Sequence, residues 1–202
     1  MIKYVQGDLF DYIKEFSDDP TITFIPHIVN TYGYWASGFV VAVEKFCPLA
    51  KQNYESLFID HAFERGMPNE TLLGNNQLVL VERNQCIVNM FAQLFGGNRP
   101  LRYDALAKCM ATLGDRANEA VKDGHQVRIV APKFGSLRAG GDWDFVEKLV
   151  EDCWISRGLD TTIIEYPHKQ IVSRCQQCNQ KAMPLFLMPN RQYFCRGCYS
   201  QR

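Results

Sequence analysis

Residues 126–166 read QVRIVAPKFGSLRAGGDWDFVEKLVEDCWISRGLDTTIIEY, and this stretch decides the fold class. Apolar, β-branched runs at 126–131 and 161–166 each predict a strand. Between them, apolar residues recur at helical spacing and predict a helix that ends near Gly158. These residues are Val146, Leu149, Val150, Cys153 and Trp154. A strand, a helix and a second strand in succession are typical of two parallel strands joined by a crossover.

The same alternation extends toward the N-terminus. Strands are predicted at 2–6, 23–29, 77–82 and 86–91. Helices are predicted from Phe39 onward, at 49–64 after Pro48, and at 106–121 before Gly124. The run at 23–29 is apolar enough to be buried on both faces of a sheet. The sequence therefore predicts an α/β fold whose sheet is largely parallel and covered by helices on both faces.

Length and charge divide the chain into two parts. Its 202 residues suit one domain with a small appendage. Residues 1–165 carry a balance of −6, whereas residues 166–202 hold six basic residues and no acidic one, a balance of +6. We therefore expect a domain at 1–166 and a second unit at 167–202. With no apolar run long enough for a bilayer and no signal-peptide pattern, we expect a cytoplasmic protein without a membrane partner.

Two CxxC pairs mark the second unit, formed by Cys175, Cys178, Cys195 and Cys198. This spacing is typical of a structural zinc ion bound by four thiolates, and predicts a small zinc ribbon. So short a tail buries too little core to fold alone, so the metal would supply folding free energy. Disulfides are the alternative, although they are disfavoured in a reducing compartment. The basic, aromatic composition leaves two roles open: binding a nucleic-acid or protein partner, and a purely structural appendage.

Three loops at predicted strand ends have an unusual composition: Gly7-Asp8, 30–38 and 135–142. In sheets of this class, ligands bind beyond the carboxyl ends of the strands. Glycines allow backbone N–H groups to approach an anion closely, and the N-terminus of a following helix favours negative charge. Two glycine-containing loops at one edge suit a pyrophosphate, and two ordinary turns are the alternative.

Six strings occur in an order that resembles the macrodomain family, which binds ADP-ribose. They are VQGDLF at 5–10, PHIVN at 26–30, YWASGFVVAVEKFCP at 34–48, IVNMFAQ at 87–93, RPLRYDAL at 99–106 and AGGDWDFV at 139–146. The resemblance covers residues 1–166 and is greatest to the phage and bacterial branch, which also holds ADP-ribose-1″-phosphate phosphatases and terminal ADP-ribose protein glycohydrolases. It implies a macrodomain-type α/β/α fold with a mixed sheet, and either a hydrolase or a non-catalytic protein that reads or sequesters ADP-ribose.

The resemblance implies a role for each loop. Asp8 would accept a hydrogen bond from the adenine amino group, with a helix N-cap as the alternative. Asn30 and loop 34–39 would surround the distal ribose, and the N–H groups of loop 135–141 would bind the phosphates. The residues expected to bind the ligand are Asp8, Leu9, Asn30, Trp35, Ser37, Gly38, Phe39, Gly135, Ser136, Leu137, Arg138, Ala139, Gly140 and Gly141.

His27 and Asp142 are the candidates for catalysis. A histidine at the His27 position has a catalytic role in phosphatase-like members, and imidazole can transfer protons near neutral pH. A histidine with satisfied hydrogen bonds at the end of a buried strand is the alternative. Asp142 would either activate a water molecule or cap the next helix, and we favour the cap. The sequence departs from related sequences at Ala36-Ser37 and Leu137-Arg138, and we expect these changes to affect catalysis more than binding.

Overall fold

In a computed structural model, the chain forms two compact units, Met1–Tyr166 and Pro167–Arg202. The structure describes residues 1–16, 18–58, 68–82, 84–94, 100–135, 139–166 and 178, and the backbone of 185–187 and 193–195. In the second unit, β7 (Leu185–Leu187) and β8 (Tyr193–Cys195) form an antiparallel pair. Of the predicted zinc ligands, Cys175 and Cys198 lie outside the described residues, as does the side chain of Cys195.

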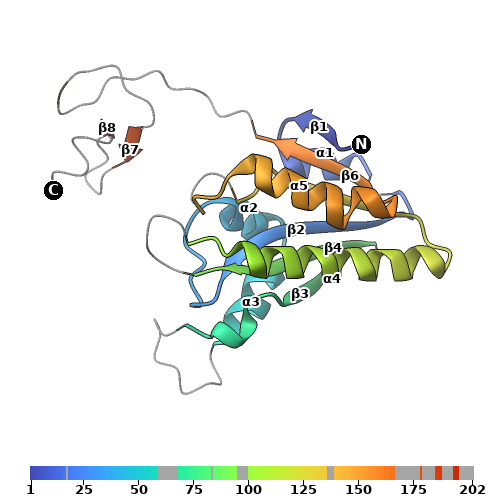
Figure 1. The fold of residues 1–202 in the computed structure, drawn as a ribbon, viewed down its shortest axis with the longest axis horizontal. Coiled ribbons are helices and arrows are strands. Elements are labelled where there is room, and N and C mark those ends of the chain that lie inside the picture. Colours follow the sequence, from blue (N-terminus) through green and yellow to red (C-terminus); the bar gives the residue numbers. More distant parts are fainter. Residues whose placement is uncertain are drawn as a thin grey trace. The chain divides into compact units, whose positions relative to one another are not determined.

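The first unit is built on a six-stranded sheet in the order β1-β6-β5-β2-β4-β3 (Figure 1). Its strands are β1 (Lys3–Gln6), β2 (Ile22–Asn30), β3 (Asn76–Glu82), β4 (Gln85–Gln93), β5 (Val127–Pro132) and β6 (Asp160–Glu165). Neighbouring strands are parallel except for β3, which pairs antiparallel with β4. The predicted α/β fold with a mixed, largely parallel sheet is confirmed, and each predicted strand is present.

Helices cover both faces of this sheet. They are α1 (Leu9–Lys14), α2 (Phe39–Phe46), α3 (Pro48–Ser56), α4 (Tyr103–Lys122) and α5 (Trp143–Cys153), with short turns of helix at η1 (Glu70–Leu72) and η2 (Ile155–Arg157). One core cluster packs α4 and α5 on the sheet through residues such as Met110 and Trp154. The other packs α1, α2 and α3 through residues such as Ile13 and Tyr54. The result is three layers, with β2 buried in the middle.

The helix predicted at 49–64 was wrong in its extent. Pro48 opens α3 as expected, but this helix ends at Ser56. The N–H groups of Leu57 and Phe58 then bond to carbonyls three residues back, which tightens the chain into a turn. The ring of Phe58 packs on that of Tyr54, with centroids 5.2 Å apart. Residues 59–64 lie outside the described part of the chain.

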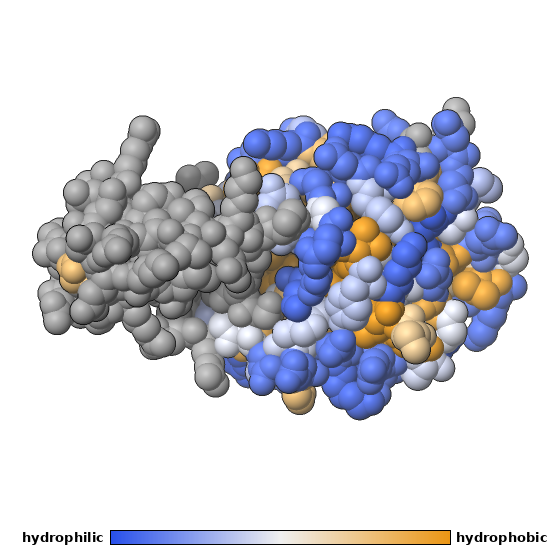
Figure 2. Space-filling model, turned by 90° about the horizontal axis from the view of Figure 1, so that it is seen from above, coloured by the Kyte–Doolittle hydropathy of each residue, from blue (hydrophilic) through white to orange (hydrophobic). Residues whose placement is uncertain are grey.

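Hydrophilic side chains cover most of the face of the first unit that Figure 2 shows, with apolar patches between them. Several large apolar residues are exposed, among them Tyr4, Leu80 and Tyr166. Within the described ranges, every helix is too short or too polar to cross a bilayer.

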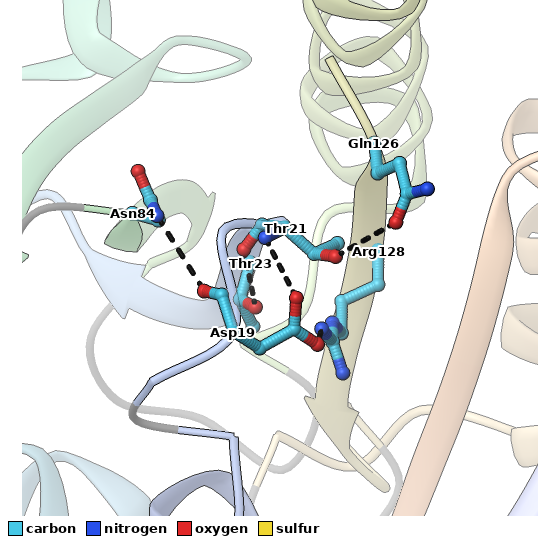
Figure 3. Close-up of polar contacts among 6 residues, drawn as sticks. All are labelled: Asp19, Thr21, Thr23, Asn84, Gln126 and Arg128. Atoms are coloured by element: carbon cyan, nitrogen blue, oxygen red, sulfur yellow. Dashed lines mark hydrogen bonds and ion pairs between the residues drawn. The ribbon is translucent and has the colours of Figure 1, made fainter.

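A polar cluster fixes the sheet edge at which β2 and β5 begin (Figure 3). The carboxylate of Asp19 forms an ion pair with Arg128 and accepts a hydrogen bond of 2.9 Å from the N–H of Thr21. The guanidinium of Arg128 also lies 4.4 Å from the ring centroid of Phe16. Asn84 donates to the carbonyl of Asp19 at 3.5 Å. The cluster therefore ties the α1–β2 connection to β5 and to the β3–β4 turn.

Asp19→Asn should lower the melting temperature at neutral pH. As the pH falls, the melting temperature of this variant should decrease less than that of the wild type. Hydrogen bonds from Thr21, and then the Arg128 partner, lower the pKa of Asp19 to about 2. Because the folded protein holds this carboxylate ionised, its stabilisation is present above about pH 4 and is lost as pH falls toward 2. Calorimetric melting curves across this range should show the difference. Asp18→Asn, at an exposed neighbour, is the control. Equal acid dependence in wild type and Asp19→Asn would contradict the assignment.

Candidate functional site

The loops singled out from the sequence meet at one edge of the sheet. Because β1, β2 and β5 are parallel, their carboxyl ends lie at the same edge (Figure 1). Residues 7–8, 31–38 and 133–142 follow these strands and are here named the carboxyl edge. After β2 the chain continues to β3, on the side of the sheet that also holds β4. After β5 it continues to β6, on the opposite side. The strand order therefore reverses between the loops after β2 and β5, where α/β proteins bind ligands.

Asp8 caps α1 through one carboxylate oxygen, and the hydrogen bonds among the described residues leave its second oxygen without a donor. Its Oδ1 accepts hydrogen bonds from the N–H groups of Phe10 at 2.8 Å and Asp11 at 3.2 Å. The N-cap alternative for this residue is thus correct, but the cap leaves Oδ2 for another donor. Leu9 is 3% exposed, so its side chain belongs to the core and only its backbone faces this edge.

Asn30 shapes the loop that follows β2. Its Oδ1 accepts from the N–H groups of Tyr32 at 2.9 Å and Tyr34 at 3.3 Å, and its Nδ2 donates to the carbonyl of Tyr34 at 2.6 Å. The hydroxyl of Tyr54 lies 2.9 Å from both Oδ1 and the carbonyl oxygen of Asn30. These bonds fold the loop back on its own strand. Tyr54, which sequence reasoning missed, is fully buried in α3.

The other residues expected to bind the ligand near the end of β2 differ in exposure. Trp35 is 7% exposed and packs on Tyr54, with ring centroids 5.2 Å apart. Ser37 and Gly38 are exposed, and Gly38 has φ +88°, a conformation that favours glycine. Phe39 begins α2 and stacks on Phe10 with centroids 5.5 Å apart. The stack joins α1, which starts after Asp8, to α2, which starts after loop 31–38.

The glycine-rich loop after β5 is closed at its base. The N–H of Gly141 donates to the carbonyl of Gly135 at 2.8 Å, and the N–H of Leu101 donates to the carbonyl of Ala139 at 3.2 Å. Gly135 and Gly140 have φ of +83° and +67°. A Cβ at Gly141 would lie 2.4 Å from Leu101 Cδ2 and 2.6 Å from the carbonyl oxygen of Gly135. Only glycine therefore fits this close approach. Ser136, Leu137 and Arg138 lie outside the described residues.

Asp142 begins α5 as its N-cap. Its carboxylate accepts a 3.0 Å hydrogen bond from the N–H of Asp144, and its own N–H donates to the hydroxyl of Tyr103 at 2.6 Å. The favoured interpretation, a cap, thus describes its position, and Tyr103 ties the loop to the start of α4. Nothing in the contacts of Asp142 supports its alternative role in activating water.

His27 is 1% exposed, three residues before the end of β2. Its Nε2 lies 2.6 Å from Asn89 Oδ1, while its Nδ1 is buried with no hydrogen-bond partner in the described part of the chain. Burial lowers the pKa of His27 to about 4, against the opposing effect of the Asn89 hydrogen bond. The ring is therefore neutral near pH 7. The burial agrees with the alternative of a histidine near the end of a buried strand, but only one of its two ring nitrogens has a partner among the described residues.

Charged groups also gather where β5 and β6 end. Lys133 forms an ion pair of 2.8 Å with Glu165 and lies 5.0 Å from the ring centroid of Trp143. Gln6 donates a hydrogen bond to the same carboxylate. Sequence reasoning missed this cluster, although Lys133 and Glu165 both stand directly at predicted strand ends.

Two surface hollows among the described residues lie elsewhere. One is lined by residues of β1 and α5, including Tyr4 and Glu147, and the other by residues of β3 and α4, including Asn76 and Lys108. Neither contains a residue that the sequence analysis proposed for ligand binding, catalysis or zinc. The candidate site is therefore defined by the position and chemistry of the loops at the carboxyl edge.

No family sequence model and no curated protein sequence matches the chain. Among solved structures, a macrodomain protein from Streptomyces coelicolor is 31% identical, with a TM-score of 0.64 over 83% of this chain and 99% of that one. A protein of unknown function from Bacteroides thetaiotaomicron is 25% identical, with a TM-score of 0.66 over 82% and 98%.

A structure of Thermosipho africanus DarTG in complex with ADP-ribose has a TM-score of 0.57. It is 16% identical and matches 84% of this chain but 43% of its own. At this identity the similarity shows a shared fold and nothing finer.

Proposed function

The chain belongs to the macrodomain family, and from this premise we propose that the carboxyl edge of its first unit binds ADP-ribose. The observation that carries the proposal is that Asp8, loop 31–38 and loop 135–141 follow parallel strands to one edge. Asp8 Oδ2 would accept from the adenine amino group, the glycine loop would bind the pyrophosphate, and loop 31–38 would enclose the distal ribose. DarTG of Thermosipho africanus, which shares this fold, has been solved in complex with ADP-ribose, and this makes ADP-ribose the first ligand to test here.

A thermal-shift titration of the full chain tests this proposal. A ligand that binds only the folded state raises the free energy of unfolding, by about 2.7 kcal/mol at 100 times its dissociation constant. We expect ADP-ribose to raise the melting temperature, and AMP to do so less at equal concentration because it leaves loop 31–38 empty. Equal shifts for AMP and ADP-ribose would contradict the assignment of loop 31–38 to the ribose.

The finer proposal is hydrolysis of an ADP-ribosyl or ADP-ribose-1″-phosphate linkage. His27 and Asp142 were its candidate catalytic residues, and burial of the first and capping by the second do not support it. The same observations favour a second candidate function, a non-catalytic protein that reads or sequesters ADP-ribose. Release of phosphate from ADP-ribose-1″-phosphate by wild-type protein would favour the hydrolase. Binding of this compound without turnover would favour the reader.

We also propose that the tail binds one structural zinc ion through Cys175, Cys178, Cys195 and Cys198. The paired spacing supports it, and β8 ends at Cys195 after pairing with β7. Four thiolates fill the coordination of zinc, so the ion would stabilise the tail and perform no catalysis. A nucleic-acid or protein partner for this basic tail remains a prediction from composition.

Metal analysis of the full chain, purified without chelator, should give close to one equivalent of zinc. Cys175→Ser should lower this content sharply, because three thiolates hold zinc less tightly than four. Cys153→Ala, at a cysteine of α5, should leave the zinc content unchanged. Disulfide pairing of the four tail thiols under reducing conditions would overturn the proposal.

A further inference from the structure

The ring of His27 contacts residues of loop 31–38 and of the start of α2; because this loop would enclose the ribose, it is called the ribose loop below. Its centroid is 5.6 Å from that of Trp35, with the two rings nearly perpendicular, and 5.8 Å from that of Phe39. Trp35 belongs to the loop after β2, and Phe39 is the first residue of α2. A change in the volume or position of this imidazole therefore acts directly on the segment that would enclose the ribose.

Hydrogen bonds fix which nitrogen of His27 carries the proton. Asn89 Nδ2 lies 2.9 Å from Gln77 Oε1 and 3.3 Å from the carbonyl oxygen of Ala50, so the amide nitrogen faces these two acceptors. Its Oδ1 therefore faces His27 and accepts from Nε2–H. The ring is held as one tautomer, and it cannot rotate without leaving buried Asn89 unsatisfied.

The network continues into the helix that shapes the same loop. Gln77 Nε2 donates to the carbonyl of Asn53 at 2.8 Å, and Ala50 and Asn53 both belong to α3. The next residue of α3 is Tyr54, whose hydroxyl bonds to Asn30. His27 is thus linked to the ribose loop twice, through ring contacts and through α3.

We propose that His27 is a positioning residue, which holds Trp35 and Phe39 in the arrangement that receives the distal ribose and does not touch the ligand. This inference rests on the proposed binding of ADP-ribose. It assigns His27 a role different from proton transfer, and it predicts an effect on ADP-ribose that AMP does not share. Asp8, which would contact the adenine, follows β1 and is linked to His27 only indirectly, through the stack of Phe39 on Phe10.

The test uses His27→Ala and His27→Gln, with His125→Gln at an exposed histidine as the control. Calorimetry gives the affinities for ADP-ribose and AMP, and the indole N–H signal of Trp35 in a ¹H–¹⁵N spectrum reports the position of the loop. His27→Ala should weaken ADP-ribose binding about tenfold, with AMP binding unchanged and the Trp35 signal shifted. His27→Gln should recover part of this loss, because its amide can donate to Asn89.

If His27→Ala does not fold, His27→Gln carries the test, with a smaller loss of ADP-ribose affinity and a shifted Trp35 signal. Unchanged ADP-ribose affinity and an unchanged Trp35 signal in His27→Gln would overturn the inference. The inference would also be overturned if the His27 variants lost turnover of ADP-ribose-1″-phosphate while their affinities for ADP-ribose and AMP stayed unchanged, since that result would assign proton transfer to His27. Failure of the wild type to bind ADP-ribose would defeat the proposed function, whereas the Trp35 signal would still show whether His27 holds the loop.

Discussion

Gly141→Ala should weaken ADP-ribose binding about 100-fold. The added Cβ would stand 2.4 Å from Leu101 Cδ2 and 2.6 Å from the carbonyl oxygen of Gly135, and the second of these atoms is backbone that cannot rotate away. The loop must then open at the Gly141–Gly135 hydrogen bond that closes it. Overpacking of this kind costs about 1–3 kcal/mol, and each 1.4 kcal/mol is tenfold in affinity.

Gly114→Ala is the matched control for this variant. A Cβ at Gly114, in α4, would lie 2.4 Å from the carbonyl oxygen of Cys153, which is as close an approach to backbone as at Gly141. Gly114→Ala should lower the melting temperature and leave the ADP-ribose affinity of the folded protein unchanged. The reason is that Gly114 and the carbonyl of Cys153 both lie away from the carboxyl edge. Calorimetric titration of both variants gives the comparison. Equal affinities in Gly141→Ala and wild type would remove the glycine loop from the site.

Asp8→Ala should weaken ADP-ribose binding about 10- to 150-fold, which corresponds to the 1.5–3 kcal/mol of a hydrogen bond to a charged group. It also removes the cap of α1, so the melting temperature should fall. Asp8→Asn separates the two effects, because an amide oxygen still caps the helix while the charge on the second oxygen is lost. Calorimetry should show weak binding in both variants, and melting curves should show near wild-type stability for Asp8→Asn. Tight binding by Asp8→Asn would contradict the adenine contact.

The fold could be predicted from local patterns because each element carries its own signal. The apolar runs gave the strands, and the recurrence of Leu106, Met110 and Leu113 gave the long helix α4. Helix α1 was missed because six residues are too few for a periodic pattern, although Asp8 before it is a capping residue. The end of α3 was missed because no glycine or proline marks it; the chain leaves the helix at Leu57 and Phe58, whose N–H groups bond to carbonyls three residues back.

The sequence could predict which loops form the candidate site, but not the hydrogen bonds that hold those loops in place. Glycines and strand ends placed the loops at one edge, since both signals are local. The bonds that shape those loops join residues far apart in sequence, such as Asn30 with Tyr54 and Asp142 with Tyr103. No spacing rule links such pairs. His27 shows the consequence: its residue type suggested proton transfer, whereas its burial, its bond to Asn89 and its ring contacts with Trp35 and Phe39 could not be read from the sequence.

Isothermal titration calorimetry of the wild-type chain with ADP-ribose tests the central claim most directly. The account predicts saturable binding of one ADP-ribose per chain, weaker binding of AMP, and loss of most ADP-ribose affinity in Asp8→Ala. It would be contradicted by the absence of any binding heat at millimolar ADP-ribose, confirmed by an unshifted melting temperature in the same solution. Binding that Asp8→Ala and Gly141→Ala leave unchanged would equally contradict it, because the ligand would then lie away from the carboxyl edge.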